Sequence, residues 1–343
     1  MRLAVVIVAF HSAEALGRTL PAVARELGPD DELIVVDNAP GDGVEALLRE
    51  HVRGARYLAN GRNAGFAAGA NQGVAASGAD VVVVLNPDAV PADGFREGIL
   101  RPVERGYGWD AWMALVTCEE GRAVNTSGGV VHFTGLAWAG EAGEPVPGTL
   151  HLPRDVGFAS GACFVMPRAA WDRHGGFAEE FFTYQEDVDL SLRIRLAGGR
   201  VGAEPAARVD HSYEFAKGTA KWRRLEANRW ATLLRTYPTL LLLAIAPALI
   251  ATELAIFAAA VAGGWGAAKL AAWGDVARSV PRLLRERREI QAQARIGAGE
   301  FAASLVGSLD SPYLGEAVRG GPVRLVLGVY WAVVRLALGA LRS

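Results

Sequence analysis

Short apolar runs alternate with segments of helical periodicity over residues 1–90, and this alternation constrains the fold more than any other feature of the sequence. The predicted strands are 4–10, 33–36, 56–59 and 81–85, and the predicted helices are 12–28, 44–52 and 66–76. Strands that alternate with helices pair in parallel through right-handed crossovers. The pattern therefore predicts an α/β domain with a doubly wound, mostly parallel sheet, in which ligands bind beyond the carboxyl ends of the strands.

The next part of the chain is less regular. Frequent turn residues over 109–152 indicate short strands and loops that shape an acceptor groove, and 158–166 is predicted as a further apolar strand. Residues 186–196 are ambiguous, because their apolar side chains alternate as in a strand. The acidic first turn, and the Gly198-Gly199 pair that follows, favour a helix there.

A strongly apolar segment begins at residue 238. Residues 238–273 contain only two charged side chains, Glu253 and Lys269, and an arginine-rich stretch follows at 278–295. One transmembrane span would place these arginines outside, against the positive-inside tendency, and two spans do not fit before Trp273. We therefore expect a re-entrant or interfacial helical hairpin whose arginines face anionic headgroups. The alternative is a buried helical subdomain, which would serve as an interface in a homo-oligomer.

A second apolar stretch covers residues 323–341. Three arginines share one edge of it at helical period, which predicts an amphipathic helix with a narrow polar side: Arg324, Arg335 and Arg342. The change in composition divides the chain into a nucleotide-binding α/β domain at 1–235 and a helical, membrane-associated region at 236–343.

Composition excludes some functions. The net charge is −2 and no basic stripe is present, so we expect no nucleic-acid partner. The two cysteines, Cys118 and Cys163, lie among apolar neighbours and are interpreted as buried free thiols in a reducing compartment. The N-terminus lacks the features of a signal peptide, which predicts that the nucleotide domain stays in the cytoplasm.

Polar residues lie at the ends of the second and fourth predicted strands, and a polar loop precedes the third predicted helix. Asp37 ends the second strand, where an acid can accept hydrogen bonds from a nucleobase or ribose, although a plain turn is the simpler reading. Residues 63–73 form a Gly- and Ala-rich loop that enters a helix, as suits a diphosphate, but match neither dinucleotide nor Walker motifs. Asp88, at the end of the fourth strand, is placed to hold Mg²⁺ or Mn²⁺ on a diphosphate.

The richest acidic cluster is at residues 186–189, beside aromatic side chains. An inverting displacement at a sugar carbon needs one carboxylate to take the proton of the acceptor hydroxyl, and apolar surroundings raise the proton affinity of such an acid. Acids at a solvated helix N-terminus are the simpler reading. His211 alone is more typical of a packed histidine, but together with Asp88 it would supply a second metal donor.

Together these segments resemble family 2 glycosyltransferases with the GT-A fold, and bacterial rhamnosyltransferases among them. The resemblance covers residues 1–235 and rests on an ordered set of motifs: 5–12, Val35-Val36-Asp37-Asn38, 63–73, Leu85-Asn86-Pro87-Asp88, Ser160-Gly161-Ala162-Cys163 and 176–189. Two positions depart from the family pattern. His11 replaces a common Asn, and Asn86 replaces the first acid of the D-x-D motif.

The resemblance implies roles for individual residues. Asp187, in the Glu-Asp motif, would be the general base, and Asp88 and His211 would bind the metal ion, Mg²⁺ or Mn²⁺. The residues expected to bind the donor are Ala9, Phe10, Asp37, Asn63, Gly65, Asn71 and Asn86. The reaction would invert the anomeric centre in one step, with the metal acting as a Lewis acid on the leaving diphosphate.

The resulting hypothesis is an inverting, metal-dependent glycosyltransferase at the cytoplasmic face of the cell membrane. By resemblance the donor is dTDP-rhamnose, and the apolar C-terminal region suits a lipid-linked glycan acceptor in cell-envelope polysaccharide synthesis. A sugar-phosphate nucleotidyltransferase would need a basic, Gly-rich loop after the first strand, where this chain has Ala9-Phe10-His11-Ser12. The remaining alternative is a non-catalytic nucleotide-sugar-binding or membrane scaffold protein on the same fold.

Overall fold

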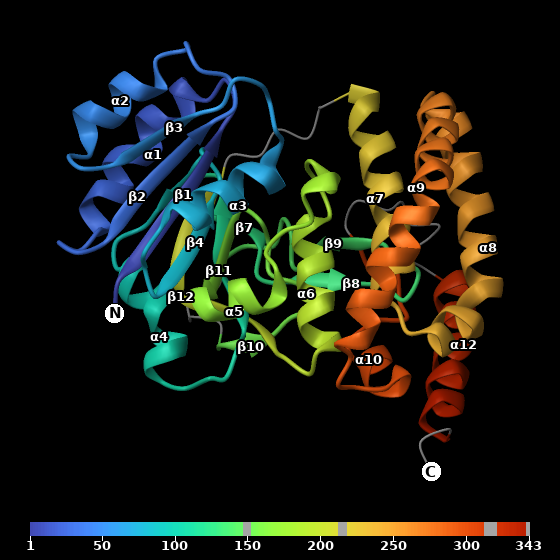
Figure 1. Cartoon of the computed structure of the whole chain (residues 1–343). Helices are drawn as coiled ribbons and strands as arrows, with labels where there is room; N and C mark the ends of the chain where they lie inside the picture. The colour runs from blue at the N-terminus through green and yellow to red at the C-terminus, as the bar shows by residue number, and fades with distance from the viewer. Residues whose placement is uncertain (147–151, 212–217, 312–320, 341–343) are drawn as a thin grey trace. The chain divides into compact units, whose positions relative to one another are not determined.

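The structure, a computed structural model, describes residues 1–146, 152–211, 218–311 and 321–340 (Figure 1). The chain divides into two compact units. Unit 1 contains the described residues of 1–129, 139–194 and 200–213, and unit 2 contains those of 130–138, 195–199 and 214–343. Helix α7 therefore belongs to unit 2, with the helices that follow it. The predicted domain boundary at residue 235 stays a prediction.

Unit 1 is built on a sheet with the strand order β10-β12-β6-β11-β4-β1-β2-β3. Its parallel part consists of β1 (Leu3–Ala9), β2 (Glu32–Asp37), β3 (Arg56–Ala59) and β4 (Val81–Leu85). The helices between these strands are α1 (Ala13–Glu26), α2 (Val44–His51) and α3 (Phe66–Ala76). These elements differ from the predicted bounds by at most two residues at either end, so the alternation of apolar runs and helical periods was a sound guide.

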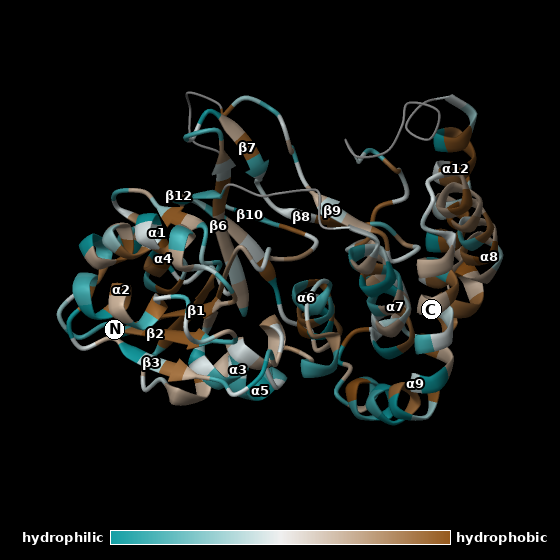
Figure 2. Cartoon of the chain, turned by 90° about the horizontal axis from the view of Figure 1, so that it is seen from above, coloured by the Kyte–Doolittle hydropathy of each residue, from teal (hydrophilic) through white to brown (hydrophobic). Residues whose placement is uncertain are grey.

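Helices cover both faces of this sheet, as a doubly wound fold requires. Figure 2 shows α1 and α4 (Phe95–Glu104) on one face and α3 and α5 (Arg168–His174) on the other. Helix α3 packs closely because its inner face is made of small residues: a Cβ atom on Gly73 would lie 2.3 Å from the side chain of Val6. The predicted α/β fold class is confirmed.

One strand in the middle of the sheet runs against its neighbours. Strand β11 (Cys163–Pro167) is antiparallel to both β4 and β6 (Ala111–Cys118), and β12 (Val201–His211) is parallel to β6. The shorter strands are β5 (Ala89–Pro91) and β10 (Arg154–Asp155) on β12, and β7 (Ala123–Thr126) on β6. Because β11 is reversed, the residues just before it lie at the same edge of the sheet as the carboxyl end of β4.

The predicted strand at 158–166 is wrong at its start. Strand β11 begins only at Cys163, and Ser160 accepts a turn hydrogen bond from the Cys163 backbone N–H at 3.2 Å. Of residues 158–162, Phe158 forms an isolated antiparallel bridge with Gly129, and the turn that follows is buried without joining the strand. Cys163 is a buried free thiol, as expected, whereas the free Cys118 is only partly buried.

Residues 186–196 form a helix, α6 (Glu186–Leu196), preceded by a short 3₁₀ turn, η1 (Glu179–Phe181). The alternating apolar residues of α6 are all buried: Val188, Leu190, Leu192, Ile194 and Leu196. A helix that is buried on several sides needs no single apolar stripe. The acidic first turn and the glycine stop were therefore better guides to this element than its periodicity.

Unit 2 is mostly helical. Its long helices are α7 (Gly218–Thr236), α8 (Thr239–Ala262), α9 (Gly266–Ala292) and α12 (Gly321–Ala340), with the short α10 (Ala298–Ala303) between the last two. Strands β8 (Gly129–Val131) and β9 (Ala137–Ala139) form a separate two-stranded sheet. By length and composition, α8 and α12 could each cross a membrane. Helix α12 matches the predicted amphipathic helix, although Arg342 lies outside the described residues.

The predicted apolar hairpin differs from the structure in where its second arm ends. Helix α9 continues through Trp273 to Ala292, so the apolar arm and the arginine-rich stretch are one helix. Several of these arginines have partners within the chain. Arg287 donates to the carbonyl oxygens of Leu234 and Tyr237, each at 2.7 Å, and so caps the C-terminus of α7 rather than facing lipid.

The two charged residues of the apolar segment belong to a buried ion cluster, here the four-charge cluster of Glu226, Arg229, Glu253 and Lys269. Lys269 Nζ lies 2.8 Å from Glu253 and also contacts Glu226. Arg229 pairs with Glu226 at 2.9 Å and contacts Glu253. Two acids and two bases balance each other, which is the condition under which buried charges are tolerated.

Candidate functional site

The predicted donor residues begin at the carboxyl ends of β1 and β2, which lie side by side because Ala9 is in register with Asp37. Ala9 is buried and accepts a hydrogen bond from the backbone N–H of Asn38 at 2.9 Å. Phe10, the next residue, is 49% exposed and its ring packs on His11 with the centroids 4.5 Å apart. An exposed ring at a strand end is available to stack on a ligand.

Asp37 is held in a fixed orientation. Its Oδ2 accepts a hydrogen bond from the Tyr57 hydroxyl at 2.8 Å, and its Oδ1 accepts one from the Ala39 backbone N–H at 2.9 Å. Burial, together with the hydrogen bond to Asp37, raises the pKa of Tyr57, so this hydroxyl stays a donor. Sequence reasoning missed Tyr57, although pairing β2 with β3 in parallel would have placed it near Asp37.

Asn38 organises the loop that leads to α3. Its amide nitrogen donates to the Gly65 carbonyl at 3.0 Å, and its side-chain oxygen accepts from the Asn60 amide at 2.8 Å and the Ala64 backbone N–H at 3.3 Å. Asn63 closes a turn in the same loop by accepting from the Gly65 N–H at 2.9 Å. Asn63 and Gly65 therefore stand at the N-terminus of α3, where the helix dipole favours an anion.

Gly65 also touches the segment that leads to the acidic cluster. Its φ is +89°, and a Cβ atom there would lie 2.6 Å from the Phe182 carbonyl oxygen, which accepts from the Ala67 N–H at 3.2 Å. Three non-glycine residues of this segment have positive φ: Phe182 at 63°, Tyr184 at 71° and Gln185 at 69°. Such conformations are costly and persist only where neighbouring structure holds them.

The predicted metal residues come together from different strands. Asp88 lies between β4 and β5, and His211 ends β12 opposite Ala89. Oδ1 of Asp88 is 3.1 Å from Nε2 of His211, and the amide nitrogen of Asn86 is 3.3 Å from the same Nε2. The His211 side chain is 5% exposed, whereas that of Asp88 is 29% exposed, so the pair opens to solvent on the Asp88 side.

Asp187 lies in the first turn of α6. Its Oδ2 accepts from the Gly161 backbone N–H and its Oδ1 from the Val188 N–H, both at 2.8 Å. Burial raises the pKa of the Asp187 carboxyl, and these backbone hydrogen bonds offset part of the rise. The backbone N–H of Asn86 donates to the Ala162 carbonyl at 3.0 Å. The turn at 160–162 thus links the residues around Asp88 to Asp187.

Glu186, next to Asp187, is almost fully buried. Its Oε2 has no hydrogen-bond partner among the described residues. Burial, and then the neighbouring Asp187 charge, raise the pKa of Glu186 well above its ordinary value. Glu186 therefore holds its proton where an exposed glutamate would be ionised.

Asn71 has a structural role in this arrangement. Its amide nitrogen donates to the Phe177 carbonyl at 2.9 Å and to Glu179 at 3.0 Å, and its oxygen accepts from the Phe177 N–H at 3.0 Å. Asn71 thereby fixes the start of the segment that carries the acidic cluster onto α3. A donor contact by Asn71 stays a prediction.

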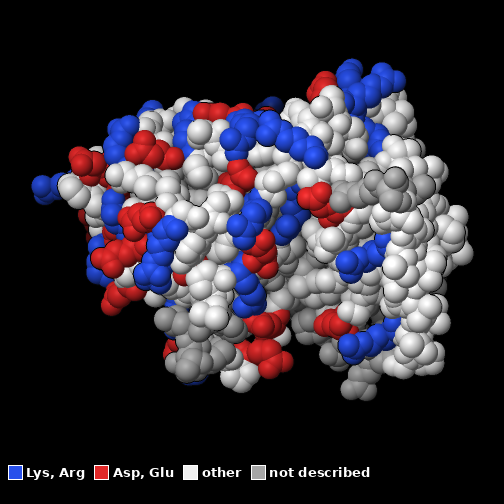
Figure 3. Space-filling model, turned by 90° about the horizontal axis from the view of Figure 1, so that it is seen from below, with Lys and Arg blue, Asp and Glu red and all other residues white. Residues whose placement is uncertain are grey.

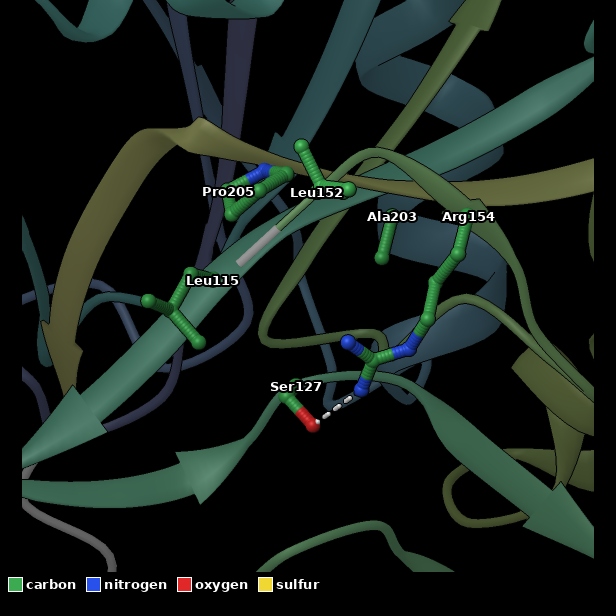
Figure 4. Close-up of a pocket in the computed structure, with 6 residues that line it drawn as sticks. All are labelled: Leu115, Ser127, Leu152, Arg154, Ala203 and Pro205. Carbon is green, nitrogen blue, oxygen red and sulfur yellow. Dashed lines mark hydrogen bonds between the residues drawn. The ribbon is translucent and has the colours of Figure 1, made fainter. Parts of the chain in front are cut away.

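A shallow pocket elsewhere in unit 1 contains none of these residues (Figure 4). It is lined by Leu115, Ser127, Leu152, Arg154, Ala203 and Pro205. The Arg154 guanidinium donates to the Ser127 hydroxyl at 2.8 Å across it. None of these six lining residues is an acid, so the pocket offers no carboxylate for a general base or a metal ligand.

No three His, Cys, Asp or Glu side chains converge on a common point in the part of the chain that the structure describes. Asp88 and His211, predicted from the sequence as metal ligands, would by themselves be an incomplete ligand set. Such a set suits a cation that takes its other oxygens from a bound diphosphate and from water.

Comparison with known proteins gives two family matches. The model of "Glycosyl transferase family 2" matches residues 4–174, and that of "Glycosyl transferase family group 2" matches residues 146–273. Two curated relatives come from Mycobacterium tuberculosis. An N-acetylglucosaminyl-diphospho-decaprenol L-rhamnosyltransferase is 26% identical over 67% of this chain and 82% of its own length. A pre-mycofactocin glycosyltransferase is 31% identical over 53% of this chain, but the match spans only 37% of that relative.

Two solved structures share the fold. GalNAc-T7, crystallised with UDP, GalNAc and Mn²⁺, superposes with a TM-score of 0.55 at 17% identity, covering 68% of this chain and 48% of its own. The present chain thus spans about half of that protein. Residues 1–349 of S. aureus TarS superpose with a TM-score of 0.51 at 14% identity, covering 98% of this chain and 88% of that one.

Proposed function

Because the chain belongs to the family 2 glycosyltransferases, we propose that it is an inverting enzyme that moves a sugar from a nucleotide-sugar donor to a lipid-linked glycan acceptor. The observation that carries the proposal is that the proposed metal ligands and the proposed general base lie at the same edge of the sheet. The Asp88–His211 pair and the half-buried Asp187 carboxylate are joined there through the 160–162 turn.

The donor would bind along the ends of β1 and β2 and the N-terminus of α3. Asp37, which is fully buried and held by Tyr57, would border the site of the base or ribose, and the exposed Phe10 ring lies one residue beyond β1. The diphosphate would lie toward the Asp88–His211 pair, with Asn63 and Gly65 bordering it at the start of α3. Similarity to the rhamnosyltransferase makes dTDP-rhamnose the first donor to test.

Asp88 and His211 fit a divalent cation, Mg²⁺ or Mn²⁺. The Asp88 carboxylate and the His211 imidazole, 3.1 Å apart, would together hold the ion, because both groups are ligands that such cations accept. A single imidazole nitrogen cannot donate to Asp88 and accept from the Asn86 amide in one tautomer. With a cation beside Asp88, the single lone pair of Nε2 would face the ion, so the Asn86 amide would have to turn to another acceptor. When bound, the ion would stabilise the negative charge of the leaving diphosphate.

Asp187 would act as the general base. As the acceptor hydroxyl oxygen forms its bond to the anomeric carbon, its proton passes to the Asp187 carboxylate and the bond from that carbon to the nucleoside diphosphate breaks. The hydrogen bonds from Gly161 and Val188 fix the direction of the carboxylate. Burial raises the pKa of Asp187 and so increases its affinity for the proton.

The acceptor is proposed from the relative that acts, by name, on N-acetylglucosaminyl-diphospho-decaprenol. Such a substrate is anchored in a membrane by its polyprenyl chain. The apolar helices α8 and α12 are the part of this chain suited to meet it, at the cytoplasmic face of the cell membrane and in the synthesis of cell-envelope polysaccharide.

The test is calorimetric titration of the purified, detergent-solubilised protein with dTDP, UDP and GDP, each with Mn²⁺ and with chelator. We expect Mn²⁺-dependent binding of one nucleotide, at least about 10-fold weaker in Asp88→Asn. The matched control is Asp93→Asn, which changes an exposed acid a few residues away. Binding of no nucleotide in either condition would remove the basis for the donor site. Binding without transfer of labelled sugar to a polyprenyl-diphosphate acceptor would favour a non-catalytic binder.

A further inference from the structure

Helices α8 and α12 each leave an apolar stripe uncovered. The exposed large side chains recur at helical spacings of three, four or seven residues, with the adjacent Leu325 and Val326 as the exception: Leu240, Leu243, Ile250, Leu254 and Val261 on α8, and Leu325, Val326, Val329, Val333 and Leu336 on α12. Leu243 is 67% exposed and Leu336 is 74% exposed. A helix on a water-facing surface carries polar residues at such positions, so this surface is built for another partner.

The two stripes belong to neighbouring helices. The Tyr330 hydroxyl of α12 donates to the Ala244 carbonyl of α8 at 2.6 Å, and Figures 1 and 2 both show the helices side by side. Figure 2 colours both helices largely brown. The right-hand part of Figure 3, over the C-terminal helices, shows few charged side chains. We call the exposed apolar side chains of α8 and α12 together the apolar face.

Another side of α8 is fixed to two other helices. Glu253 of α8 pairs with Arg229 of α7 and, at 2.8 Å, with Lys269 of α9, and Trp273 donates to it at 2.7 Å. Lys269 is completely buried. Separating α8 would leave these charges unpaired, and a lone acid in the middle of a bilayer is costly. Helix α8 is thus held along α7 and α9 and can offer a membrane only its outer side.

The charges at the border of the apolar face are arginines. Arg324 and Arg335 are eleven residues apart, three helical turns, and so lie on one line along α12, beside the buried positions Trp331 and Leu338. The α12 sequence contains no acid, and Arg324 is 62% exposed although it pairs with Asp310 at 3.6 Å. Long basic side chains beside an apolar stripe reach toward the headgroup level, where anionic lipids attract them.

We propose that the apolar face lies in the plane of an anionic lipid surface and enters one leaflet, and that α8 and α12 do not cross the bilayer. The helices are about 36 Å and 30 Å long, so either could span by length alone. The charged side of α8, which is held by α7 and α9, and the arginines along α12 favour helices that lie in the plane of the membrane over helices that cross it. The apolar face would bring the proposed transferase to the membrane of its lipid-linked acceptor. That purpose rests on the proposed function, whereas the surface itself does not.

Flotation of the purified full-length chain with vesicles tests the proposal. We expect it to float with vesicles of phosphatidylcholine containing phosphatidylglycerol, and less with phosphatidylcholine alone or at high salt. The double variants Leu243→Glu/Leu254→Glu on α8 and Val329→Glu/Leu336→Glu on α12 should each lower the bound fraction more than about 10-fold. Leu152→Glu is the matched control, because Leu152 is 80% exposed but lies in unit 1.

Depth is tested by alkaline carbonate, which should release the floated chain, since it removes interfacial proteins and leaves spanning ones. Resistance to carbonate would overturn the in-plane arrangement. Unchanged flotation of both double variants would overturn the apolar face. A dimer of the chain that both double variants dissociate, without any flotation, would instead assign the face to a second copy. Each variant is also titrated with nucleotide, so a lost donor site is distinguished from a lost lipid surface.

Discussion

Phe182 lies so close to Gly65 that a Cβ atom at position 65 would stand 2.6 Å from its carbonyl oxygen and 2.6 Å from its ring. The contact joins the loop proposed to border the donor diphosphate to the segment that carries Asp187. The 182–185 backbone is unusual, with three non-glycine residues at positive φ, and the contact with α3 is one of the features that hold it. One packing arrangement therefore sets both the proposed donor loop and the segment that carries the proposed general base.

Gly65→Ala should lower both stability and transfer. The new methyl group meets Phe182, and the φ of +89° is unfavourable for alanine, so we expect a loss of roughly 1–3 kcal/mol. Thermal unfolding and sugar transfer would be measured together. The control is Gly17→Ala in α1, where nothing lies within 4 Å of the new Cβ; it should stabilise by about 0.5–1 kcal/mol. Equal behaviour of the two variants would contradict the role of the contact.

The rate of transfer should fall on the acid side through the ionisation of Asp187. Only the carboxylate can take the acceptor proton, and burial raises the pKa of Asp187 above its ordinary value of 3.8. Asp187→Asn should lower kcat by about 10²- to 10⁴-fold while nucleotide affinity stays near wild type. A pH profile of kcat, with the exposed Asp172→Asn as control, checks this. Full activity of Asp187→Asn would assign the base to another residue.

Glu186→Gln should change how stability depends on pH. The folded protein keeps a proton on Glu186 above its ordinary pKa of 4.5, whereas the unfolded chain releases it there. Stability therefore falls as the pH rises from 4.5 toward the raised pKa of Glu186. Glutamine is neutral throughout, so the melting temperatures of variant and wild type should agree near pH 4 and diverge in favour of the variant at about pH 8. A constant difference at all pH values would show that Glu186 is not the group involved.

Lys269→Met should be among the most destabilising substitutions in unit 2. It leaves Glu226 and Glu253 with Arg229 as the remaining base of the four-charge cluster, and breaking a buried ion pair from one side costs about 3–5 kcal/mol. Thermal unfolding in detergent gives the measurement. Arg49→Met removes an exposed pair with Glu45 and should cost less than about 0.5 kcal/mol. A small effect of Lys269→Met would mean that water reaches the cluster.

The parallel half of the sheet was predictable because each of its strands is a short, strongly apolar run. Val81 to Leu85, for example, is buried on every side, and its composition alone indicates a strand. Strand β12 was missed for the opposite reason. Its sequence contains Gly202, Glu204 and Pro205, which are poor strand formers, and its place beside β6 comes from tertiary pairing.

The candidate site was predictable where it follows strand ends and obscure where it depends on distant contacts. Asp37 and Asp88 end apolar runs, so their position at the sheet edge followed from the pattern. The approach of His211 to Asp88 depends on the β12–β5 pairing, and that of Gly161 to Asp187 on the reversal of β11. Neither leaves a periodic signal in the sequence. The linkage of Glu253 to Arg229 and Lys269 joins three helices and was likewise visible only as two isolated charges.

The four-charge cluster also has a consequence for how the chain is made. Glu226, Arg229 and Glu253 leave the ribosome before Lys269, so a nascent chain that ends between residues 253 and 268 carries two of the acids and only one of the bases. Helix α8 cannot bury Glu253 in balance until the first turn of α9 has been synthesised. The three helices must therefore assemble together, and a chain that ends between residues 262 and 269 would retain one surplus negative charge within its most apolar segment.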